Sequence, residues 1–244
     1  MTIQERKTIR QYQDKDVADD LLCRLLADAS RAATMGNMQL YSVVVSRDPD
    51  MKGKLAPLHF NQPMVKGAPV VLTVCADYNR FSQWCQLRDA QPGYDNFLSF
   101  VNAATDALLF TQALTTLAEE QGLGTCFLGT TLYTAQEIIR LLNLPKLTFP
   151  IATITLGYPA ENPGQSDRLP VEAFVHRETY AQYTEADINR AYHAKEGLEE
   201  NRRFVEINHK TTLAQVFTDC RYTKNDNEAI SGSLMEALKE QGFL

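Results

Sequence analysis

Residues 96–124 read NFLSFVNAATDALLFTQALTTLAEEQGLG, and their apolar positions recur with the period of a helix. We expect this helix to run from about Asn96 to Gln121. The glycines at 122 and 124 should end it, because glycine is favoured just beyond a helix C-terminus. One side carries large apolar residues, and small residues elsewhere would let a second helix approach closely. The first side carries Phe97, Val101, Ala104, Leu108 and Leu109. The small residues are Ala103, Ala107 and Ala113.

Short apolar runs on either side of this helix predict strands. The run PVVLTVCA at residues 69–76 is almost continuous in apolar residues, as expected when both faces of a strand are covered. Strands are expected at residues 40–46, 69–76, 125–128 and 150–157, and further helices at residues 17–33, 135–142, 185–197 and 227–241. Polarity rises at about residue 195. We therefore expect a body, residues 1–195, and an extension, residues 196–244, that packs on the body or on a partner subunit.

The composition is that of an ordinary globular protein and argues against several kinds of partner. The chain has 244 residues, a formal net charge of -6 and no extended Lys/Arg face, which argues against nucleic acid. The N-terminus lacks the apolar segment of a secretory signal, and no apolar run approaches the roughly 20 residues that span a membrane. Five scattered cysteines without CxxC spacing predict a reducing, cytoplasmic setting, and four isolated histidines predict no metal site.

Three cations and a hydroxyl lie together near the N-terminus, in the run RKTIR at residues 6–10. Guanidinium forks, fixed charge and a short hydroxyl donor suit a phosphate monoester. A solvated basic terminus is the simpler alternative for so short a run. The distant segment SDRLP at residues 166–170 favours the phosphate site, because Arg168 on a stiff loop would approach the same anion from another side.

Three loops carry groups that suit a flat heterocyclic ligand. The loop TMGNMQ at residues 34–39 offers amide side chains, which both donate and accept hydrogen bonds. Gln62 is either a polar contact at a pocket mouth or a plain loop residue. Gly129, after the third strand, would let a backbone N–H approach the ligand closely, although each loop taken alone also fits an ordinary turn. The glycines at 122 and 124 do not form a dinucleotide fingerprint, since they follow a helix and precede a strand.

Four segments carry a resemblance when they are taken in order and at their distances. They are ERKTIRQY at residues 5–12, AATMGNMQ at 32–39, GLGTCFLG at 122–129 and TLGYPAENPGQSDRLP at 155–170. Together they resemble the FMN-dependent nitroreductase and flavin reductase family, nearest its oxygen-insensitive NADPH nitroreductase group. The resemblance covers most of residues 1–180. It implies an α+β, nitroreductase-like fold with a mixed central sheet flanked by helices, in an intertwined homodimer with FMN at the subunit interface.

The resemblance also implies which residues bind FMN. The N-terminal motif would hold the phosphate and the ribityl chain, and Arg168 would also meet the phosphate. The 34–39 loop would lie under the isoalloxazine, Gln62 would lie near the ring, and the backbone at residues 128–130 would face its N5 edge. The implied cofactor-binding residues are Arg6, Lys7, Thr8, Arg10, Thr34, Met35, Gln39, Gln62, Leu128, Gly129, Thr130 and Arg168.

The sequence departs from the family pattern at several of these places. Ser166 stands where the group often has lysine, which removes a cation from the phosphate site. Met35 replaces a small hydroxyl residue, and Thr130 replaces the second glycine of a Gly-Gly pair. The cations that could bind the 2′-phosphate of NADPH are Lys195, Arg202 and Arg203. Several glutamates lie in the same stretch of sequence. The choice between NADPH and NADH therefore stays open.

The residues contain no Ser-His-Asp set, carboxylate pair or activated cysteine, so we expect the bound flavin rather than a side chain to carry the chemistry. The implied reaction passes hydride from NADPH or NADH to flavin N5 and then reduces a nitroaromatic, a quinone or free flavin in ping-pong order. Two alternatives remain. One is another flavin enzyme on the same fold, such as a reductive dehalogenase or an enzyme of specialised metabolism, with its selectivity in residues 81–100. The other is a non-catalytic flavin-binding protein.

Overall fold

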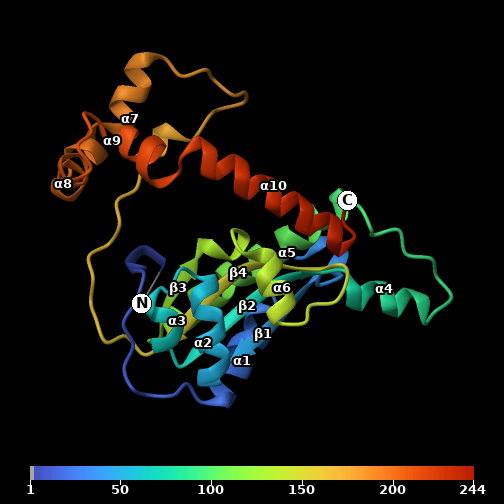
Figure 1. The fold of residues 1–244 in the computed structure, drawn as a ribbon. Coiled ribbons are helices and arrows are strands. Elements are labelled where there is room, and N and C mark those ends of the chain that lie inside the picture. The colour runs from blue at the N-terminus through green and yellow to red at the C-terminus, as the bar shows by residue number, and fades with distance from the viewer. Residues whose placement is uncertain (1–2) are drawn as a thin grey trace. The chain divides into compact units, whose positions relative to one another are not determined.

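The computed structural model describes residues 3–244, which divide into two compact units (Figure 1). The first unit holds the chain up to Gln165 together with Gly232–Leu244, and the second is Ser166–Ser231. The expected division into a body, residues 1–195, and an extension, residues 196–244, stays a prediction.

The first unit contains a four-stranded sheet in the order β1-β2-β4-β3. Its strands are β1 (Tyr41–Ser46), β2 (Val70–Asp77), β3 (Gly124–Leu128) and β4 (Thr148–Gly157). The α+β class and the four strand positions expected from the sequence are confirmed. All three strand pairings are antiparallel. Within residues 3–244 the parallel component of the expected mixed sheet is the isolated bridge between Thr8 and Thr125.

Helices account for most of the remaining chain. In the first unit they are α1 (Asp19–Ala29), α2 (Pro49–Leu58), α3 (Pro63–Gly67), α4 (Asn79–Gln86), α5 (Phe97–Glu120) and α6 (Ala135–Leu141), with 3₁₀ turns at Ile3–Glu5, Met35–Asn37 and Gly129–Leu132. The second unit holds α7 (Glu185–Gly197), α8 (Glu199–Ile207), α9 (Leu213–Val216), a 3₁₀ turn at Val171–Ala173 and a π-helical turn at Phe217–Arg221. The chain passes from the first unit to the second after Gln165, and it returns to the first unit within α10 (Lys224–Gln241).

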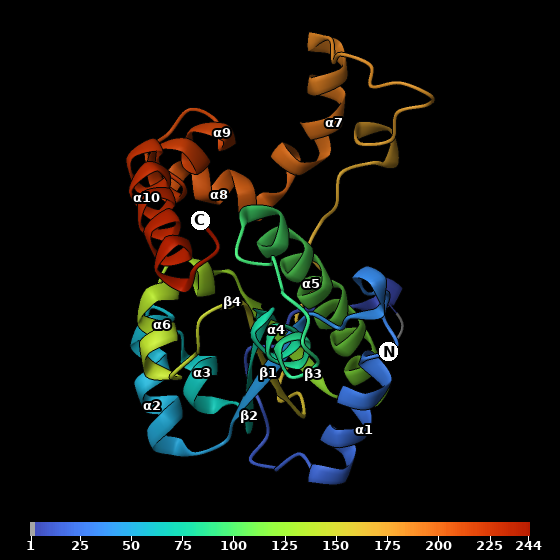
Figure 2. The same ribbon diagram turned by 90° about the vertical axis from the view of Figure 1, so that its right-hand side faces the viewer.

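Both faces of the sheet are covered, with α1 and α5 on one side and α2, α3 and α6 on the other (Figure 2). The central strand β2 shows how this follows from the sequence. Val70 and Leu72 belong to the larger core, which includes side chains of α1 and α5, whereas Val71 belongs to a second core with side chains of α2 and α3. Successive side chains of a strand point to opposite faces, so a strand covered on both sides must be apolar throughout. β2 is buried along its whole length, as the run PVVLTVCA predicts.

The long helix α5 contacts all four strands. The side chain of Asn96 caps its start by accepting from the backbone N–H of Ser99, and Gly122 follows its end with a φ of +78°. The small residues Ala103 and Ala107 lie in the larger core, while the large apolar side chains expected along one side of the helix are mostly exposed. The exposed apolar residues are Phe97, Leu98, Val101, Leu108 and Leu109.

By length and composition, α5 is the one helix among the described residues that is long and apolar enough to cross a membrane. This corrects the expectation that no segment approaches that length. The core helix of a globular protein can have the same composition, and α5 buries the carboxylates of Asp106 and Glu119 on its covered face. The helix is therefore weak evidence for a membrane span.

Candidate functional site

The N-terminal motif, residues 6–10, runs along the edge of the sheet beside β3. The backbone N–H of Ile9 donates to the carbonyl oxygen of Thr125 at 2.9 Å. The close approach depends on Gly124, because a Cβ at that position would lie 2.6 Å from the Ile9 side chain. The glycine-rich turn after α5 thus both ends the helix and makes room for the motif.

The three cations of the motif have different surroundings. Arg6 Nε lies 3.6 Å from Oε1 of the buried Glu119, and Lys7 Nζ donates to Oδ1 of Asn162 at 2.7 Å. The guanidinium of Arg10 is exposed and has no hydrogen bond or ion pair to another group within residues 3–244. Arg10 is therefore the cation of the motif that is most free to meet an anion.

Two carboxylates contact the motif or its neighbouring strand. Glu119 accepts a hydrogen bond from the Thr125 hydroxyl at 2.8 Å; burial raises the pKa of Glu119, and this hydrogen bond and Arg6 oppose the rise. Glu161 accepts from the backbone N–H of Arg10 at 2.5 Å. Glu119 holds the Arg6 side chain, and Glu161 holds the backbone at Arg10. These contacts fix the positions of Thr8 and Arg10.

The 34–39 loop is held from two sides by charged side chains of opposite sign. The Asp106 carboxylate, 2% exposed on α5, accepts from the backbone N–H of Met35 at 2.8 Å and of Leu40 at 3.1 Å. Arg80 on α4 donates to the carbonyl oxygen of Gln39. The backbone N–H groups thus bond to a carboxylate, and the carbonyl oxygen bonds to a guanidinium. Such charge-assisted hydrogen bonds are stronger than those between neutral groups.

The local conformation of this loop presents its side chains outward. Gly36, Asn37 and Gln39 have φ values of 54°, 58° and 54°, a left-handed region that bends the chain sharply. The Thr34 hydroxyl accepts from the backbone N–H of Gln39 at 3.3 Å. Thr34 is half-buried, whereas the side chains of Met35 and Gln39 are exposed and accessible to a ligand.

The turn after β3 contacts the loop between α2 and α3, residues 59–62. His59 is fully buried, and its Nδ1 lies 2.8 Å from Oγ1 of Thr130. Burial lowers the pKa of His59 to about 4. Gln62 ends the loop and is half-buried, and a Cβ added to Gly129 would meet open space. The Leu128 side chain lies in the second core, so a ligand at this strand end would meet the backbone of Leu128.

The structure gathers eleven of the twelve predicted cofactor-binding residues into three sets within the first unit. The motif lies beside the start of β3, and Gln62 and Thr130 lie near its end. The anchors of the motif and of the 34–39 loop, Glu119 and Asp106, are about 20 Å apart along α5 at 1.5 Å per residue. No hydrogen bond or ion pair within residues 3–244 joins one set to another.

Arg168, the twelfth residue, belongs to the second unit. Its exposed guanidinium donates to the backbone carbonyl oxygen of Asp167 at 2.8 Å. The Asp167 carboxylate pairs with Lys195 at 2.9 Å, so one of the cations considered for the 2′-phosphate of NADPH already has a partner. Arg202 and Arg203, the other two, are exposed on α8.

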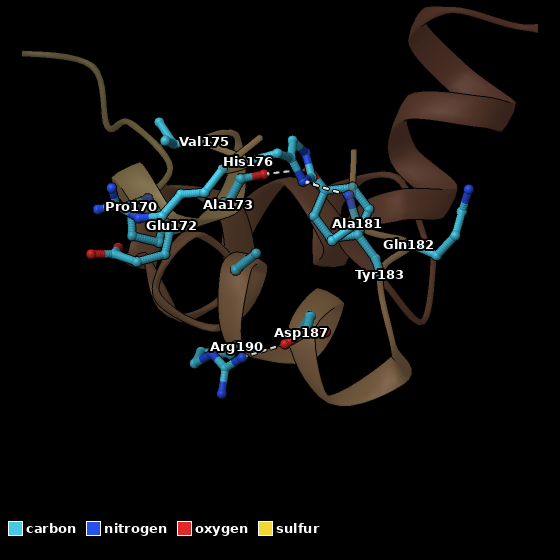
Figure 3. Close-up of a pocket in the computed structure, with 12 residues that line it drawn as sticks. Pro170, Glu172, Ala173, Val175, His176, Ala181, Gln182, Tyr183, Asp187 and Arg190 are labelled. Carbon is cyan, nitrogen blue, oxygen red and sulfur yellow. Dashed lines mark hydrogen bonds and ion pairs between the residues drawn. The ribbon is translucent and has the colours of Figure 1, made fainter. Parts of the chain in front are cut away.

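The second unit also contains a cavity of about 420 Å³ beside the turn at Val171–Ala173 (Figure 3). His176 and Tyr183 line it. Nδ1 of His176 accepts from the backbone N–H of Ala181, and Nε2 of His176 lies 3.1 Å from the Tyr183 hydroxyl, which donates to a backbone carbonyl. The polar atoms of His176 and Tyr183 thus already have hydrogen-bond partners in the protein. None of the twelve predicted residues lines the cavity. We therefore do not assign the cofactor to it.

Four residues that support the site escape the sequence patterns: Arg80, Asp106, Glu119 and His59. Each acts on a partner far away in sequence, as Asp106 and Met35 do across 71 positions. A signal existed for Asp106, because it interrupts the apolar face that carries Ala103 and Ala107. Nothing in the sequence pairs it with the 34–39 loop.

The chain is similar to several known proteins. The Nitroreductase family model matches residues 3–158. The chain is 35% identical over 181 residues to FMN reductase (NAD(P)H) of Bacillus subtilis, covering 73% of each protein. It is 32% identical over 174 residues to the oxygen-insensitive NADPH nitroreductase of Salmonella typhimurium, covering 71% of each. A crystal structure from Bacteroides fragilis has a TM-score of 0.98 and 60% identity, and it covers 99% of this chain and 98% of that one.

Proposed function

The chain belongs to the nitroreductase family, and from this premise we propose that it is an FMN-dependent NAD(P)H oxidoreductase. It takes hydride from NADPH or NADH and passes the electrons through FMN to a nitroaromatic, a quinone or free flavin, in ping-pong order. The observation that carries the proposal is the family match over residues 3–158, the range that contains every predicted cofactor-binding residue except Arg168.

The donor groups of this chain fit FMN. The exposed guanidinium of Arg10, the hydroxyl of Thr8 and the ammonium of Lys7 are the kinds of donor that a phosphate monoester takes. The exposed amide of Gln39 and the half-buried amide of Gln62 both donate and accept, which suits the alternating edges of the isoalloxazine. Ser166 in place of lysine and Met35 in place of a hydroxyl weaken the set without removing its main members.

When bound, FMN supplies hydride acceptance and electron transfer, so no side-chain acid or base is required. The residues then have three tasks. Arg10 and Thr8 bind the phosphate end, the Asp106 and Arg80 contacts keep the 34–39 loop in one conformation, and cationic or polar donors near the ring stabilise added negative charge. Groups held in place before binding cost less entropy when the ligand arrives.

We further propose that the working protein is a homodimer with its cofactor at the subunit interface. The three sets of candidate residues are separated within one chain, so a second copy that faces the first would bring complementary sets together. The five exposed apolar side chains of α5 support this arrangement, because an exposed apolar surface favours a partner.

A kinetic assay separates this function from its alternatives. NADPH and NADH oxidation would be measured with a quinone, a nitroaromatic and free FMN as acceptors, over a grid of both substrate concentrations. We expect parallel double-reciprocal lines, the mark of ping-pong order. Turnover limited to halogenated acceptors would favour a reductive dehalogenase, and FMN binding without any turnover would favour the non-catalytic alternative.

The same assay decides the nicotinamide. Arg202 and Arg203 remain as exposed cations for a 2′-phosphate, but Lys195 is paired with Asp167, so we propose use of NAD(P)H without a stated preference. A cytoplasmic location is part of the proposal. It is supported by the cysteines, all five of which are free thiols.

A further inference from the structure

A buried histidine lies directly behind the end of β3. His59 is fully buried, and its Nδ1 is 2.8 Å from Oγ1 of Thr130. The other ring nitrogen, Nε2, is buried and has no hydrogen-bond partner within residues 3–244. Thr130 is one of the implied FMN-binding residues, whereas His59 has no part in the function proposed above.

The segment that carries His59 is fixed in an unusual conformation. Phe60 and Asn61 both have left-handed φ values, 55° and 54°, and for a bulky residue such as Phe60 this is costly. The hydroxyl of Thr134 donates to the carbonyl oxygen of Leu58 at 2.7 Å, which ties the segment to the chain that follows β3. The contact between His59 and Thr130 is thus made by two segments that a second hydrogen bond, from Thr134 to Leu58, also holds together.

Two proton arrangements can join His59 to Thr130. A neutral imidazole has one N–H donor and one bare nitrogen acceptor. If the Thr130 hydroxyl donated to Nδ1, the proton of the ring would sit on Nε2, and a buried N–H would have no acceptor. If Nδ1–H donates to Thr130, Nε2 is bare and buried. A buried donor without an acceptor is rarer in folded proteins than a buried acceptor without a donor, so the second arrangement is favoured.

The second arrangement leaves the Thr130 proton without a protein acceptor. Oγ1 of Thr130 has no other hydrogen bond within residues 3–244. Thr130 is half-buried, and its neighbour Gly129 borders open space. In this arrangement the O–H is free to donate to a ligand atom.

We propose that His59 is a positioning residue: its Nδ1–H donates to Oγ1 of Thr130 and so sets the Thr130 hydroxyl as a hydrogen-bond donor to an acceptor atom on the ring edge of FMN. This inference rests on the proposed function, because it names what Thr130 donates to. It also gives a role to a departure from the family pattern. The side chain that replaces the second glycine is one that His59 orients.

The first test reads the tautomer of His59 in the full chain without FMN. Protein labelled with ¹⁵N-histidine would be studied by two-dimensional ¹H–¹⁵N NMR through multiple-bond couplings, with His59→Leu identifying the signals of His59. We expect the pattern of an Nδ1–H imidazole. The Nε2–H pattern overturns the proposal, whether or not the protein binds FMN.

The second test measures the FMN dissociation constant by fluorescence titration. Thr130→Val removes the hydroxyl with little change of shape and should weaken binding roughly 3- to 10-fold, as the loss of one neutral hydrogen bond does. Thr130→Ser keeps the hydroxyl and should bind within about twofold of wild type. His59→Leu should weaken binding like Thr130→Val, and the double variant should add nothing further, since both changes remove one interaction.

Wild-type binding by Thr130→Val overturns the proposal. So does a loss in His59→Leu that adds to the loss in Thr130→Val, because His59 would then act through the fold and not through Thr130. If wild type itself binds no FMN, the proposed function fails, and the tautomer still decides the contact between His59 and Thr130.

Discussion

Of the three cations in the N-terminal motif, Arg6 and Lys7 already contact Glu119 and Asn162. Arg10 is exposed and makes no ion pair or hydrogen bond with another described group. The cation that a sequence motif offers to a ligand is therefore decided residue by residue, by which partners the fold has already supplied.

Arg10→Ala should weaken FMN binding by about 1.5–3 kcal/mol, the effect of one charged hydrogen bond, which is roughly 10- to 150-fold in the dissociation constant. The thermal midpoint of the protein without FMN should not change, because the Arg10 side chain is exposed. Arg24→Ala, an exposed arginine on α1, is the matched control. Equal FMN binding by both variants would remove Arg10 from the phosphate site.

Two glycines near β3 should respond differently to alanine. A Cβ at Gly124 would lie 2.6 Å from Ile9, so Gly124→Ala should cost about 1–3 kcal/mol of stability through overpacking. A Cβ at Gly129 meets open space, so Gly129→Ala should leave stability nearly unchanged and weaken FMN binding instead. Urea denaturation measures the stability of both variants, and FMN titration measures their binding of the cofactor. Equal loss of stability in the two would contradict it.

The buried imidazole of His59 predicts a pH dependence of stability. Burial lowers the pKa of His59 in the folded state to about 4, while an unfolded histidine titrates near 6.5, so the unfolded state binds the proton more readily between these values. Stability is full above pH 6.5 and falls as pH drops toward 4, by on the order of 3 kcal/mol. The difference in unfolding free energy between wild type and His59→Leu isolates this effect. A difference that is constant from pH 7 to 4.5 would refute it.

At the scale of elements, the 34–39 loop depends on two helices that are distant from it in sequence. Asp106 on α5 accepts from the N–H of Met35 in the loop and of Leu40 just after it, and Arg80 on α4 donates to a carbonyl oxygen within the loop. Because three of its residues have left-handed φ values, the loop needs such partners to keep its shape.

Asp106→Asn should loosen this loop. The amide has one oxygen to accept with, and its NH₂ group would face a backbone N–H, so we expect a loss of about 1–3 kcal/mol in stability and weaker FMN binding. Hydrogen exchange at the amides of Met35 and Leu40 should become faster, which locates the effect. Asp28→Asn, an exposed residue on α1, is the control. Unchanged exchange at both amides would show that Asp106 does not hold the loop.

The elements that the sequence predicts are those with a strong period or a continuous apolar run. β2, β4, α5 and α7 lie at or within three residues of their expected positions, because each is long or is bounded by a clear cap. The helix α2 is missed, since Gly53 and Pro57 interrupt its pattern. Its start was nevertheless signalled by Asp48, whose side chain accepts from the N–H of Met51, with proline at the first helical position.

The candidate site was predictable to a similar degree. The sequence indicates three parts of the site: the N-terminal motif, the 34–39 loop and the end of β3. Each is a short contiguous segment, so its residue types and their order can be read together. The residues that hold them, such as Asp106 and His59, are not indicated. Their roles depend on pairings across 71 positions of the chain in both cases, which only the fold creates.

At the scale of the whole molecule, the proposed homodimer would cover an exposed apolar part of α5. Ala103 and Ala107 face the larger core, so the large apolar side chains of α5 remain exposed. The C-terminal end bears on the proposed division at residue 195. Leu238 and Phe243 are buried in the larger core, so a chain that ends at residue 195 would lose core contacts.

Leu108→Glu should dissociate the proposed dimer, because it puts a charge into an apolar surface that a partner would cover. Size-exclusion chromatography should show a monomer, and FMN binding should fall together with the loss of the interface. Val45→Glu, at an exposed apolar residue of β1 with a similar exposed fraction, is the control. A Leu108→Glu protein that stays dimeric with normal FMN binding would show that α5 is not the interface.

The most direct test of the central claim is the visible absorption spectrum of the purified protein, followed without oxygen as NADPH or NADH is added. The account predicts flavin absorption bands, present as purified or after reconstitution with FMN, that bleach on addition of the nicotinamide. A protein that stays colourless after incubation with FMN, or whose flavin bands neither nicotinamide bleaches, would contradict it.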